Sequence, residues 1–336
     1  MVSESRYTMN FILAVTTYNR LFYLRRLIES WYETRCSSCN WQLIIADDGS
    51  DDGTTEYLNE LKQKDTNFTL IENYHQGVHH QTNSILRKIE GTSFDMCFKL
   101  DDDVAFLKNG WDLAYYNIAK KTGFWHLCFY DTNWVLENNL KESIVKDDLI
   151  CHCDPKNIQG AFFTITPTII QKVGYFDIDN FGFKGLGHMD FTFRCCRYGF
   201  NDIESPFDIV NSNQYITLQD KTNYKRSTSI QFDRSINSPA EIKRKLALVQ
   251  DPTRGYIPYK KGSIYESVLD PEVGEYQRLA DEKFYFSDGV YSVIGTLIRR
   301  FYNFHVRNRW TYFPKLIKKI GKVFMKLGED LYFIDR

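Results

Sequence analysis

Three consecutive acidic residues, Asp101-Asp102-Asp103, are the first feature of the sequence that suggests chemistry. They follow an apolar run that ends at Leu100, so their carboxylates are expected at the tip of a buried strand. Hard divalent cations such as Mg²⁺ and Mn²⁺ prefer oxygen ligands and leave room for phosphate oxygens beside one or two carboxylates. A solvated acidic turn is the plainer interpretation of three aspartates alone. Their position after a buried strand favours a metal site.

Two further polar clusters follow apolar runs earlier in the chain. Residues 11–15 lead into the polar segment 16–20, and residues 42–46 lead into the segment 47–50. Short, β-rich apolar runs bounded by polar turns predict buried strands. The acidic run at 101–103 is therefore the third polar cluster to follow a predicted strand.

The segments between these strands have helical spacing. The sequence predicts helices over 21–31, 54–64, 79–88 and 189–198, and further strands at 68–72, 96–100 and 160–166. Strands that alternate with helices of this length predict βαβ units and a mostly parallel α/β sheet. Because ligands bind beyond the carboxyl ends of such strands, the three polar clusters should meet in one crevice.

Taken together, the motifs resemble family 2 glycosyltransferases of the GT-A fold. The matching segments are Val15-Thr-Thr-Tyr-Asn-Arg20, Ile45-Ala-Asp-Asp-Gly-Ser-Asp-Asp-Gly-Thr54, Gln76-Gly-Val78 with Asn83, Leu100-Asp-Asp-Asp-Val104 and Gly187-His-Met-Asp190. Each motif is short, but their order and spacing over residues 10–205 make a strong combined signal. The resemblance implies a Rossmann-like, mostly parallel sheet with helices on both faces, and transfer of a sugar from a nucleotide-sugar donor.

The resemblance also implies roles for single residues. Thr16 and Tyr18 would lie against the nucleotide base, and Asp47 or, preferably, Asp48 would accept a hydrogen bond from a ring N–H. Asp101 would lie near the ribose and help Asp103 to ligate Mn²⁺ or Mg²⁺, although three adjacent acids allow Asp102 to exchange roles with either neighbour. The predicted donor-binding residues are Thr16, Thr17, Tyr18, Arg20, Asp47, Asp48, Gly77, Asn83, Lys99, Asp101 and Asp102.

Residues 187–190 match the acceptor side of the family site. Family members usually have Glu-Asp at the start of a helix, with the Asp as general base. Met189 replaces the Glu, so only Asp190 carries over as the catalytic base, and His188 and Met189 are predicted to contact the acceptor. A carboxylate can deprotonate an attacking hydroxyl, and the family pattern implies inversion. The alternative is that Asp190 only stabilises the helix N-terminus, where acids are favoured.

Several other residues are weaker candidates. A third metal ligand is not evident, because the only histidine after residue 188 is His305, but Gln219-Asp220 could supply an oxygen. Lys225 and Arg226 could clamp phosphates or be simple surface charges. The cysteines at 36, 39, 151 and 153 are enough for one zinc, but the pairs lie far apart in sequence. With no visible export signal, reduced thiols are the favoured interpretation of the eight cysteines.

A basic segment lies near the end of the chain. Residues 290–327 carry nine Lys or Arg and no acid, although the net charge of the whole chain is only -1. Pro314 divides this segment into predicted helices at 291–309 and 315–327, the second with an apolar face flanked by lysines. This pattern is typical of a helix lying in an anionic membrane interface. A helix packed on the catalytic domain is the alternative. Nucleic acid is not a predicted partner, because the rest of the chain is acidic.

The sequence therefore predicts three parts. These are a GT-A catalytic domain at 1–210 with a nucleotide-sugar half at 8–105 and an acceptor half at 106–210, a loop-rich extension at 211–288 that closes over the site, and a basic amphipathic helical tail at 289–336. The predicted activity is that of a metal-dependent, inverting hexosyltransferase. It would move sugar from a UDP-sugar to a glycan or glycolipid acceptor, as in surface polysaccharide synthesis. With no signal peptide or spanning segment visible, we expect a cytoplasmic protein peripheral to the inner face of the membrane.

Two other functions compete with this prediction. A nucleotidyltransferase also combines a parallel sheet with a carboxylate-bound metal, but it should have a Gly-rich loop after the first strand, and residues 16–20 contain no glycine. A catalytically silent module that docks on membranes is kept open by Met189. Turnover of a nucleotide-sugar separates a transferase from both.

Overall fold

The computed structural model describes residues 8–73, 76–131, 160–182, 185–202, 208–220 and 240–259 in full, and the backbone alone at 145–146, 150–152, 207, 239, 276–278 and 284–286. The chain divides into two units, residues 1–260 and 261–336. In the second unit, β11 (Tyr276–Arg278) pairs antiparallel with β12 (Phe284–Phe286). The predicted helices of the basic segment lie outside the described residues.

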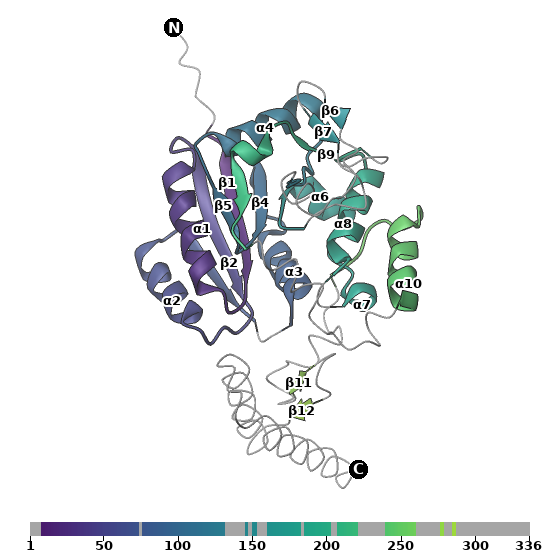
Figure 1. Cartoon of the computed structure of the whole chain (residues 1–336), viewed down its shortest axis with the longest axis horizontal. Coiled ribbons are helices and arrows are strands. Elements are labelled where there is room, and N and C mark those ends of the chain that lie inside the picture. Colours follow the sequence, from purple (N-terminus) through teal and green to yellow (C-terminus); the bar gives the residue numbers. More distant parts are fainter. Residues whose placement is uncertain are drawn as a thin grey trace. The chain divides into compact units, whose positions relative to one another are not determined.

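A five-stranded sheet with the order β3-β2-β1-β4-β8 forms the centre of the first unit (Figure 1). The four strands β1 (Asn10–Thr17), β2 (Asn40–Asp47), β3 (Phe68–Glu72) and β4 (Met96–Asp101) run parallel. Strand β8 (Phe162–Ile165) pairs antiparallel with β4. β1, β2 and β4 are almost continuously buried, as expected where helices cover both faces of a parallel sheet. The prediction of a mostly parallel sheet is confirmed.

Helices cover both faces of this sheet. Successive side chains of β1 point to opposite faces, so each set of its residues packs against different helices. Leu13 packs with α1 (Leu21–Thr34), α2 (Thr54–Lys64) and α4 (Trp111–Thr122). Ile12 and Ala14 pack with α3 (Val78–Ile89), α6 (Pro167–Val173) and α8 (Gly187–Arg197). This arrangement confirms the predicted fold class.

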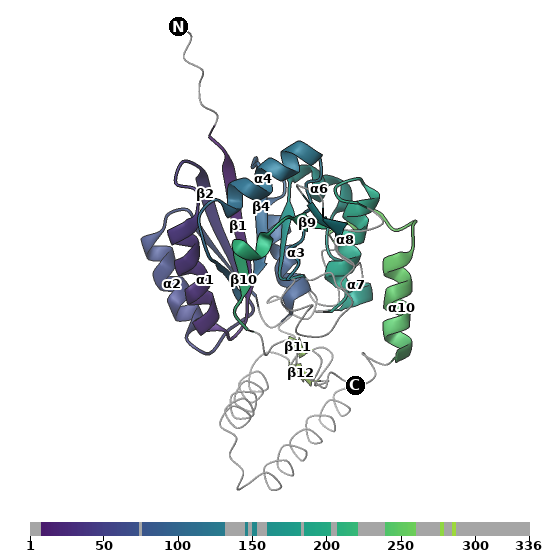
Figure 2. The same ribbon diagram turned by 45° about the horizontal axis from the view of Figure 1, so that its top comes forward.

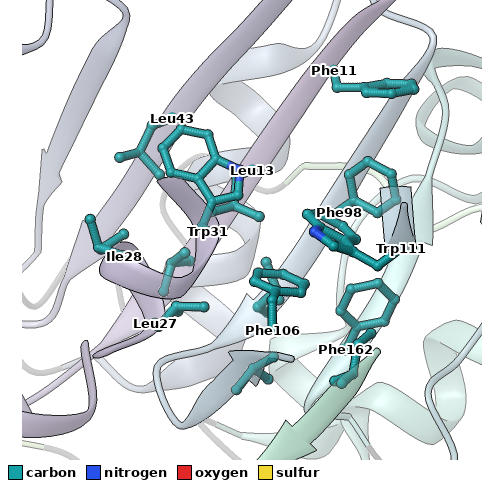
Figure 3. Packing of buried hydrophobic residues seen from close by; sticks show 14 of the residues in the cluster. Phe11, Leu13, Leu27, Ile28, Trp31, Leu43, Phe98, Phe106, Trp111 and Phe162 are labelled. Atoms are coloured by element: carbon teal, nitrogen blue, oxygen red, sulfur yellow. The ribbon is translucent and has the colours of Figure 1, made fainter. Parts of the chain in front are cut away.

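Aromatic rings fill the core between the sheet and helices α1 and α4 (Figure 3). The rings of Phe106 and Trp111 stack with centroids 3.9 Å apart, and Phe98 meets Trp111 edge-on at 4.9 Å. Burial of such large side chains supplies much of the hydrophobic free energy of a fold. Part of the high aromatic content therefore serves packing rather than binding.

Smaller elements join distant segments to the sheet. Strand β5 (Val104–Phe106) pairs antiparallel with β10 (Ile216–Leu218), and β6 (Val145–Lys146), β7 (Ile150–His152) and β9 (Phe207–Ile209) form a separate antiparallel sheet. The short helices are α7 (Ile178–Phe181) and the 3₁₀ helix η2 (Ser212–Gln214). Helix α10 (Pro239–Gln250) packs beside α8 (Figure 2). The segments 207–220 and 239–259 therefore belong to the same unit as the main sheet.

Gly174 holds one of these distant segments in place. It has φ +77°, and a Cβ at this position would lie 1.9 Å from the carbonyl oxygen of Ile257. We expect Gly174→Ala to lower the free energy of unfolding by about 2–4 kcal/mol, because backbone strain and a steric clash add together. Urea unfolding measures this loss. Gly91→Ala is the control, since Gly91 has φ +76° with open space around it, and should cost about 1–2 kcal/mol. Equal losses in both variants would contradict the clash.

Candidate active site

The three polar clusters lie at one edge of the sheet, where β1, β2 and β4 end. The Thr16 hydroxyl donates to Asp101 Oδ1 at 3.2 Å, and the Thr17 hydroxyl donates to Asp102 Oδ2 at 2.8 Å. The amide of Asp48 donates to the carbonyl oxygen of Thr17 at 3.0 Å. The predicted convergence of the three clusters is therefore confirmed.

Arg20 is the centre of a group of carboxylates at this edge. It precedes the first turn of α1, and its Nη1 lies 3.1 Å from Asp102 Oδ1. Its Nη2 lies 3.1 Å from Asp103 Oδ2 and 2.9 Å from Asp220 Oδ2. We call Asp101, Asp102, Asp103 and Asp220 the carboxylate cluster. One guanidinium thus holds three of its four members.

Asp101 is the member of the acidic run that is most open to solvent. Its side chain is 35% exposed, whereas those of Asp102 and Asp103 are 4% and 11% exposed. The side chain of Lys99 is buried, and its Nζ donates to Asp101 Oδ1 at 2.6 Å. A ligand approaching from solvent would therefore meet Asp101 first.

The charges of this edge do not balance. Burial raises the pKa of Asp102 to about 7, with Arg20 acting against the rise and Asp103 adding to it. Burial likewise raises the pKa of Asp103, again opposed by Arg20. Four carboxylates face two cations, Arg20 and Lys99, which leaves a formal excess of two negative charges when all four are ionised.

The donor atoms of the carboxylate cluster are those that Mg²⁺ and Mn²⁺ prefer, and the charge excess is that of one divalent ion. Within the fully described ranges, however, no three His, Cys, Asp or Glu side chains are arranged around a common point as metal ligands. Arg20 instead occupies the space between Asp102, Asp103 and Asp220. The cluster fits a divalent metal by chemistry and charge, and Arg20 would have to share its carboxylates with the ion.

Asp47 and Asp48 fix the loops that border this edge. The Asp48 carboxylate accepts hydrogen bonds from the amides of Gln76 and Gly77 at 2.7 and 2.8 Å. Asp47 accepts from the Ser50 amide at 3.2 Å and from the Thr55 hydroxyl at 2.8 Å. Both side chains are buried. Each therefore stabilises a loop, and the choice between them for the nucleotide base stays open.

Tyr18 and Asn83 lie differently with respect to the cluster. Tyr18 is half-buried in the turn directly after β1, beside the two threonines that contact the acidic run. Asn83 is buried on α3 and exchanges two hydrogen bonds with the backbone of Phe176, at 2.8 and 3.0 Å. Asn83 thus ties α3 to the segment before α7 by these two hydrogen bonds.

The acceptor-side residues lie in the first turn of α8. Asp190 is 0% exposed and receives Arg194 Nε at 2.8 Å and Arg254 Nε at 2.9 Å, one on each carboxylate oxygen. Met189 is buried and packs with Phe181 and Val249. His188 is half-buried, so it is the most accessible of the three predicted acceptor-side residues.

Two more residues have a part in the site: Asp220, which the sequence offered only as a weaker metal-ligand candidate, and Arg254, which it did not indicate. Asp220 joins the cluster because β10 pairs with β5, which follows the acidic run; the amide of Gln219 donates to the Asp103 carbonyl at 2.7 Å. Arg254 reaches Asp190 from 64 positions further along the chain. The sequence pattern, an acidic residue directly after an apolar strand, indicated Asp220. No pattern in the sequence indicated Arg254.

The cysteines offer no described metal centre. Cys36 and Cys39 are free thiols near the end of α1, and four further described cysteines, at 97, 128, 195 and 196, are also free. The side chains of Cys151 and Cys153, which the zinc hypothesis requires, lie outside the described residues. Lys225 and Arg226 lie outside them as well.

A comparison with protein families identifies the family of the chain. The sequence model of glycosyl transferase family 2 matches residues 12–200, which include Arg20, the acidic run and Asp190. The chain belongs to this family. A relative in Acanthamoeba polyphaga mimivirus, an uncharacterised glycosyltransferase, is 29% identical over 180 residues, which are 53% of this chain and 68% of the viral one.

Solved structures resemble this family 2 glycosyltransferase at lower identity. The S. aureus TarS fragment in complex with UDP is 15% identical with a TM-score of 0.49, over 72% of this chain and 64% of the TarS fragment. A mannosyltransferase of Pyrobaculum calidifontis, in complex with GDP-Man and Mn²⁺, is 15% identical with a TM-score of 0.47, over 72% and 69% of the two chains. Within the described part of the present chain, no helix is long and apolar enough to cross a membrane.

Proposed function

We propose that this glycosyltransferase is a metal-dependent enzyme that transfers a sugar from a UDP-sugar with inversion at the anomeric carbon. The observation that supports it most directly is the carboxylate cluster around Arg20 at the ligand-binding edge of the sheet, which has a formal excess of two negative charges when all four carboxylates are ionised. A nucleoside diphosphate brings further negative charge. It can bind beside these carboxylates only if a cation comes with it.

Asp101 and Asp103 are the residues that would hold Mn²⁺ or Mg²⁺. The bound ion would neutralise charge on the departing diphosphate. Thr16 and Thr17 fix the orientation of Asp101 and Asp102 by hydrogen bonds, and Lys99 pairs with Asp101. Arg20 offsets the mutual repulsion of Asp102, Asp103 and Asp220. These side chains therefore prepare an anionic site before the donor arrives.

The nucleotide would lie along the ends of β1 and β2. Thr16, Tyr18 and either Asp47 or Asp48 are the groups proposed for the base, and Asp101 is proposed for the ribose. Asp48 fixes the loop at Gln76 and Gly77, so it can shape this part of the site even without direct contact. The choice of uridine follows the resemblance to family 2.

The acceptor is proposed to be a glycan or glycolipid presented at the cytosolic face of a membrane. The support is the basic segment 290–327, with nine cations and no acid. Each cation near an anionic lipid surface contributes about 1 kcal/mol to binding. We propose that this basic tail docks the enzyme on the membrane.

Truncation after Asp288 tests this docking. We expect the full chain to sediment with vesicles of anionic lipid and the truncated chain to remain in the supernatant, because the nine cations are lost. Vesicles of neutral lipid are the control. Equal sedimentation of both proteins would refute the membrane proposal and leave the transferase proposal untouched.

Turnover of nucleotide-sugars tests the enzymatic proposal. The purified chain is incubated with Mn²⁺ and each of several UDP-, GDP-, CDP- and ADP-sugars, and release of the nucleoside diphosphate is measured. Release from a UDP-sugar, abolished by EDTA, is the expected result. Release of pyrophosphate would instead indicate a nucleotidyltransferase, and no turnover with any donor would favour a silent docking module.

A further inference from the structure

We propose that Cys36 and Cys39 form a redox-active dithiol, in which Cys36 attacks a small-molecule disulfide and Cys39 then closes an intramolecular disulfide bond. The two cysteines follow the C-terminal end of α1, whereas Arg20 precedes its first turn. A helix of 14 residues is about 21 Å long, so the dithiol lies well away from the carboxylate cluster. The inference does not depend on the proposed transferase activity.

The backbone brings the two cysteines within reach of each other. Helix α1 ends at Thr34, and the next residue, Arg35, is extended. The amide of Cys39 then donates to the carbonyl oxygen of Cys36 at 3.4 Å, which closes a four-residue turn. The first and last Cα atoms of such a turn lie less than about 7 Å apart, and disulfides join Cα atoms about 4.4–6.8 Å apart. A bond between the two sulfurs therefore requires little movement of the backbone.

Two neighbouring elements hold this turn in place. The amide of Cys36 donates to Asp112 Oδ2 at 2.6 Å, and Trp41 Nε1 donates to the carbonyl oxygen of Cys36 at 3.0 Å. Asp112 lies in the first turn of α4 and Trp41 lies in β2, and both side chains are buried. The backbone of Cys36 is thus fixed from both sides, so the dithiol is arranged before an oxidant arrives.

Three hydrogen-bond donors converge on the sulfur of Cys36. The Ser38 hydroxyl lies 3.2 Å from Cys36 Sγ, and the Ser38 amide and the Cys39 thiol also form hydrogen bonds with this sulfur. Hydrogen bonds to the charged form of a group favour that form. Burial alone would raise the pKa of Cys36, but these hydrogen bonds lower the pKa overall. Cys36 therefore holds more of the nucleophilic thiolate than an ordinary cysteine does.

Cys39 has the opposite character and suits the second step. It is buried in the aromatic core, and burial, together with the hydrogen bond to Cys36, raises the pKa of Cys39 to about 12. Its thiol therefore stays protonated and donates to the sulfur of Cys36. Once Cys36 has reacted it carries no charge, so its share of this rise disappears and Cys39 ionises more easily.

Exposure also favours Cys36 as the attacking thiol. Six cysteines have described side chains, and five of them are buried, whereas Cys36 is half-buried. The two serines between Cys36 and Cys39 are exposed, so the turn lies at the surface of the protein. Redox-sensitive cysteines combine a low pKa with solvent access and often have a second cysteine beside them. Cys36 and Cys39 meet these three conditions.

The proposed reaction balances as two thiol–disulfide exchanges. The Cys36 thiolate attacks one sulfur of oxidised glutathione, forms a mixed disulfide and expels one glutathione thiolate. Cys39 then loses its proton to water, attacks the sulfur of Cys36 and expels the second glutathione thiolate. The chain is oxidised by two electrons, and one molecule of oxidised glutathione is reduced to two thiols.

Equilibration of the full chain with mixtures of reduced and oxidised glutathione tests the dithiol. After acid quenching and alkylation, trypsin releases residues 36–62, a peptide that contains only these two cysteines. We expect this peptide to become an internal disulfide that dithiothreitol reverses. Cys39→Ser should stop at the mixed disulfide with glutathione, and Cys36→Ser should form neither product. Two alkylated thiols at every glutathione ratio would overturn the inference.

Two substitutions of exposed residues test the thiolate without touching either cysteine. Ser38→Ala removes a hydroxyl that donates to the Cys36 thiolate, so alkylation of Cys36 by iodoacetamide should become about three- to tenfold slower at neutral pH. Ser37→Ala is the matched control in the same turn, and we expect its rate to equal that of the wild type. Equal rates in the two variants would contradict the proposed role of the turn.

The zinc content of the purified chain separates the dithiol from a metal site. Thiolates that bind zinc are held by the metal, whereas a redox-active dithiol is free to exchange. We expect no zinc to copurify in an amount that depends on Cys36 or Cys39. One zinc per chain that is lost in both Cys36→Ser and Cys39→Ser would overturn the inference.

Discussion

Replacing Asp103 by asparagine should lower the rate of nucleotide-sugar turnover by about 10³-fold or more. Asp103 is the proposed metal ligand, and loss of several kcal/mol of charge stabilisation on the diphosphate corresponds to this factor. Release of UDP from a UDP-sugar with Mn²⁺ measures it. Asp65→Asn is the matched control, because Asp65 follows α2 at the far end from the carboxylate edge, where its carboxylate accepts hydrogen bonds from Tyr32 and Asn67. A turnover rate of Asp103→Asn within tenfold of the control would contradict the metal role.

The same variant should not lose stability. Burial raises the pKa of Asp103, so the folded protein favours the neutral carboxyl more than the unfolded chain does, and the ionised form costs free energy at neutral pH. Asparagine is neutral and removes that cost. Arg20 keeps Asp102 and Asp220 as partners. A melting temperature equal to or above that of the wild type would show that lost turnover reflects lost chemistry rather than unfolding.

Arg194→Met, by contrast, should lower the stability of the folded protein strongly. Arg194 is 0% exposed and holds Asp190 together with the carbonyl oxygens of Val173 and Tyr175. Removing one partner of a buried ion pair leaves the other charge uncompensated and costs about 3–5 kcal/mol. For a unit of this size, the melting temperature should fall by about 6–20 °C. Calorimetry or circular dichroism measures the shift.

An exposed arginine provides the control for this loss. Arg87 pairs with Glu90 on the surface of α3, and its side chain is 57% exposed. Surface pairs contribute about 0–1 kcal/mol, so Arg87→Met should melt within about 4 °C of the wild type. Similar melting temperatures for the Arg194 and Arg87 variants would contradict the stabilising role of the buried pair of Arg194 and Asp190.

The strands and helices that carry the donor side follow from local sequence. Helix α2 spans Thr54–Lys64, the range predicted from its spacing, and β3 spans the predicted 68–72. Each of these elements has a continuous apolar run or a clear helical period, bounded by polar turns. Their carboxyl ends meet at one edge because parallel topology requires it, so the convergence of Thr16, Thr17 and the acidic run could be predicted without coordinates.

The acceptor side and the charge partners could not be derived in this way. Asp220 reaches Arg20 across 200 positions, and Arg254 reaches Asp190 across 64. No periodicity encodes such contacts, because they depend on how β10 pairs with β5 and how Tyr256 and Ile257 pack on Gly174. Asp190 matched a family motif by position alone. Its complete burial between two arginines is a tertiary property.

Calorimetric titration of the purified chain with UDP tests the central claim most directly, which is that the carboxylate cluster binds a nucleoside diphosphate through a divalent cation. With Mn²⁺ present, we expect UDP to bind to the wild type and to Asp65→Asn, and not to Asp103→Asn. With EDTA, binding to all three should disappear, because the excess negative charge of the cluster then repels the diphosphate. UDP binding of equal strength with Mn²⁺ and with EDTA would contradict the account.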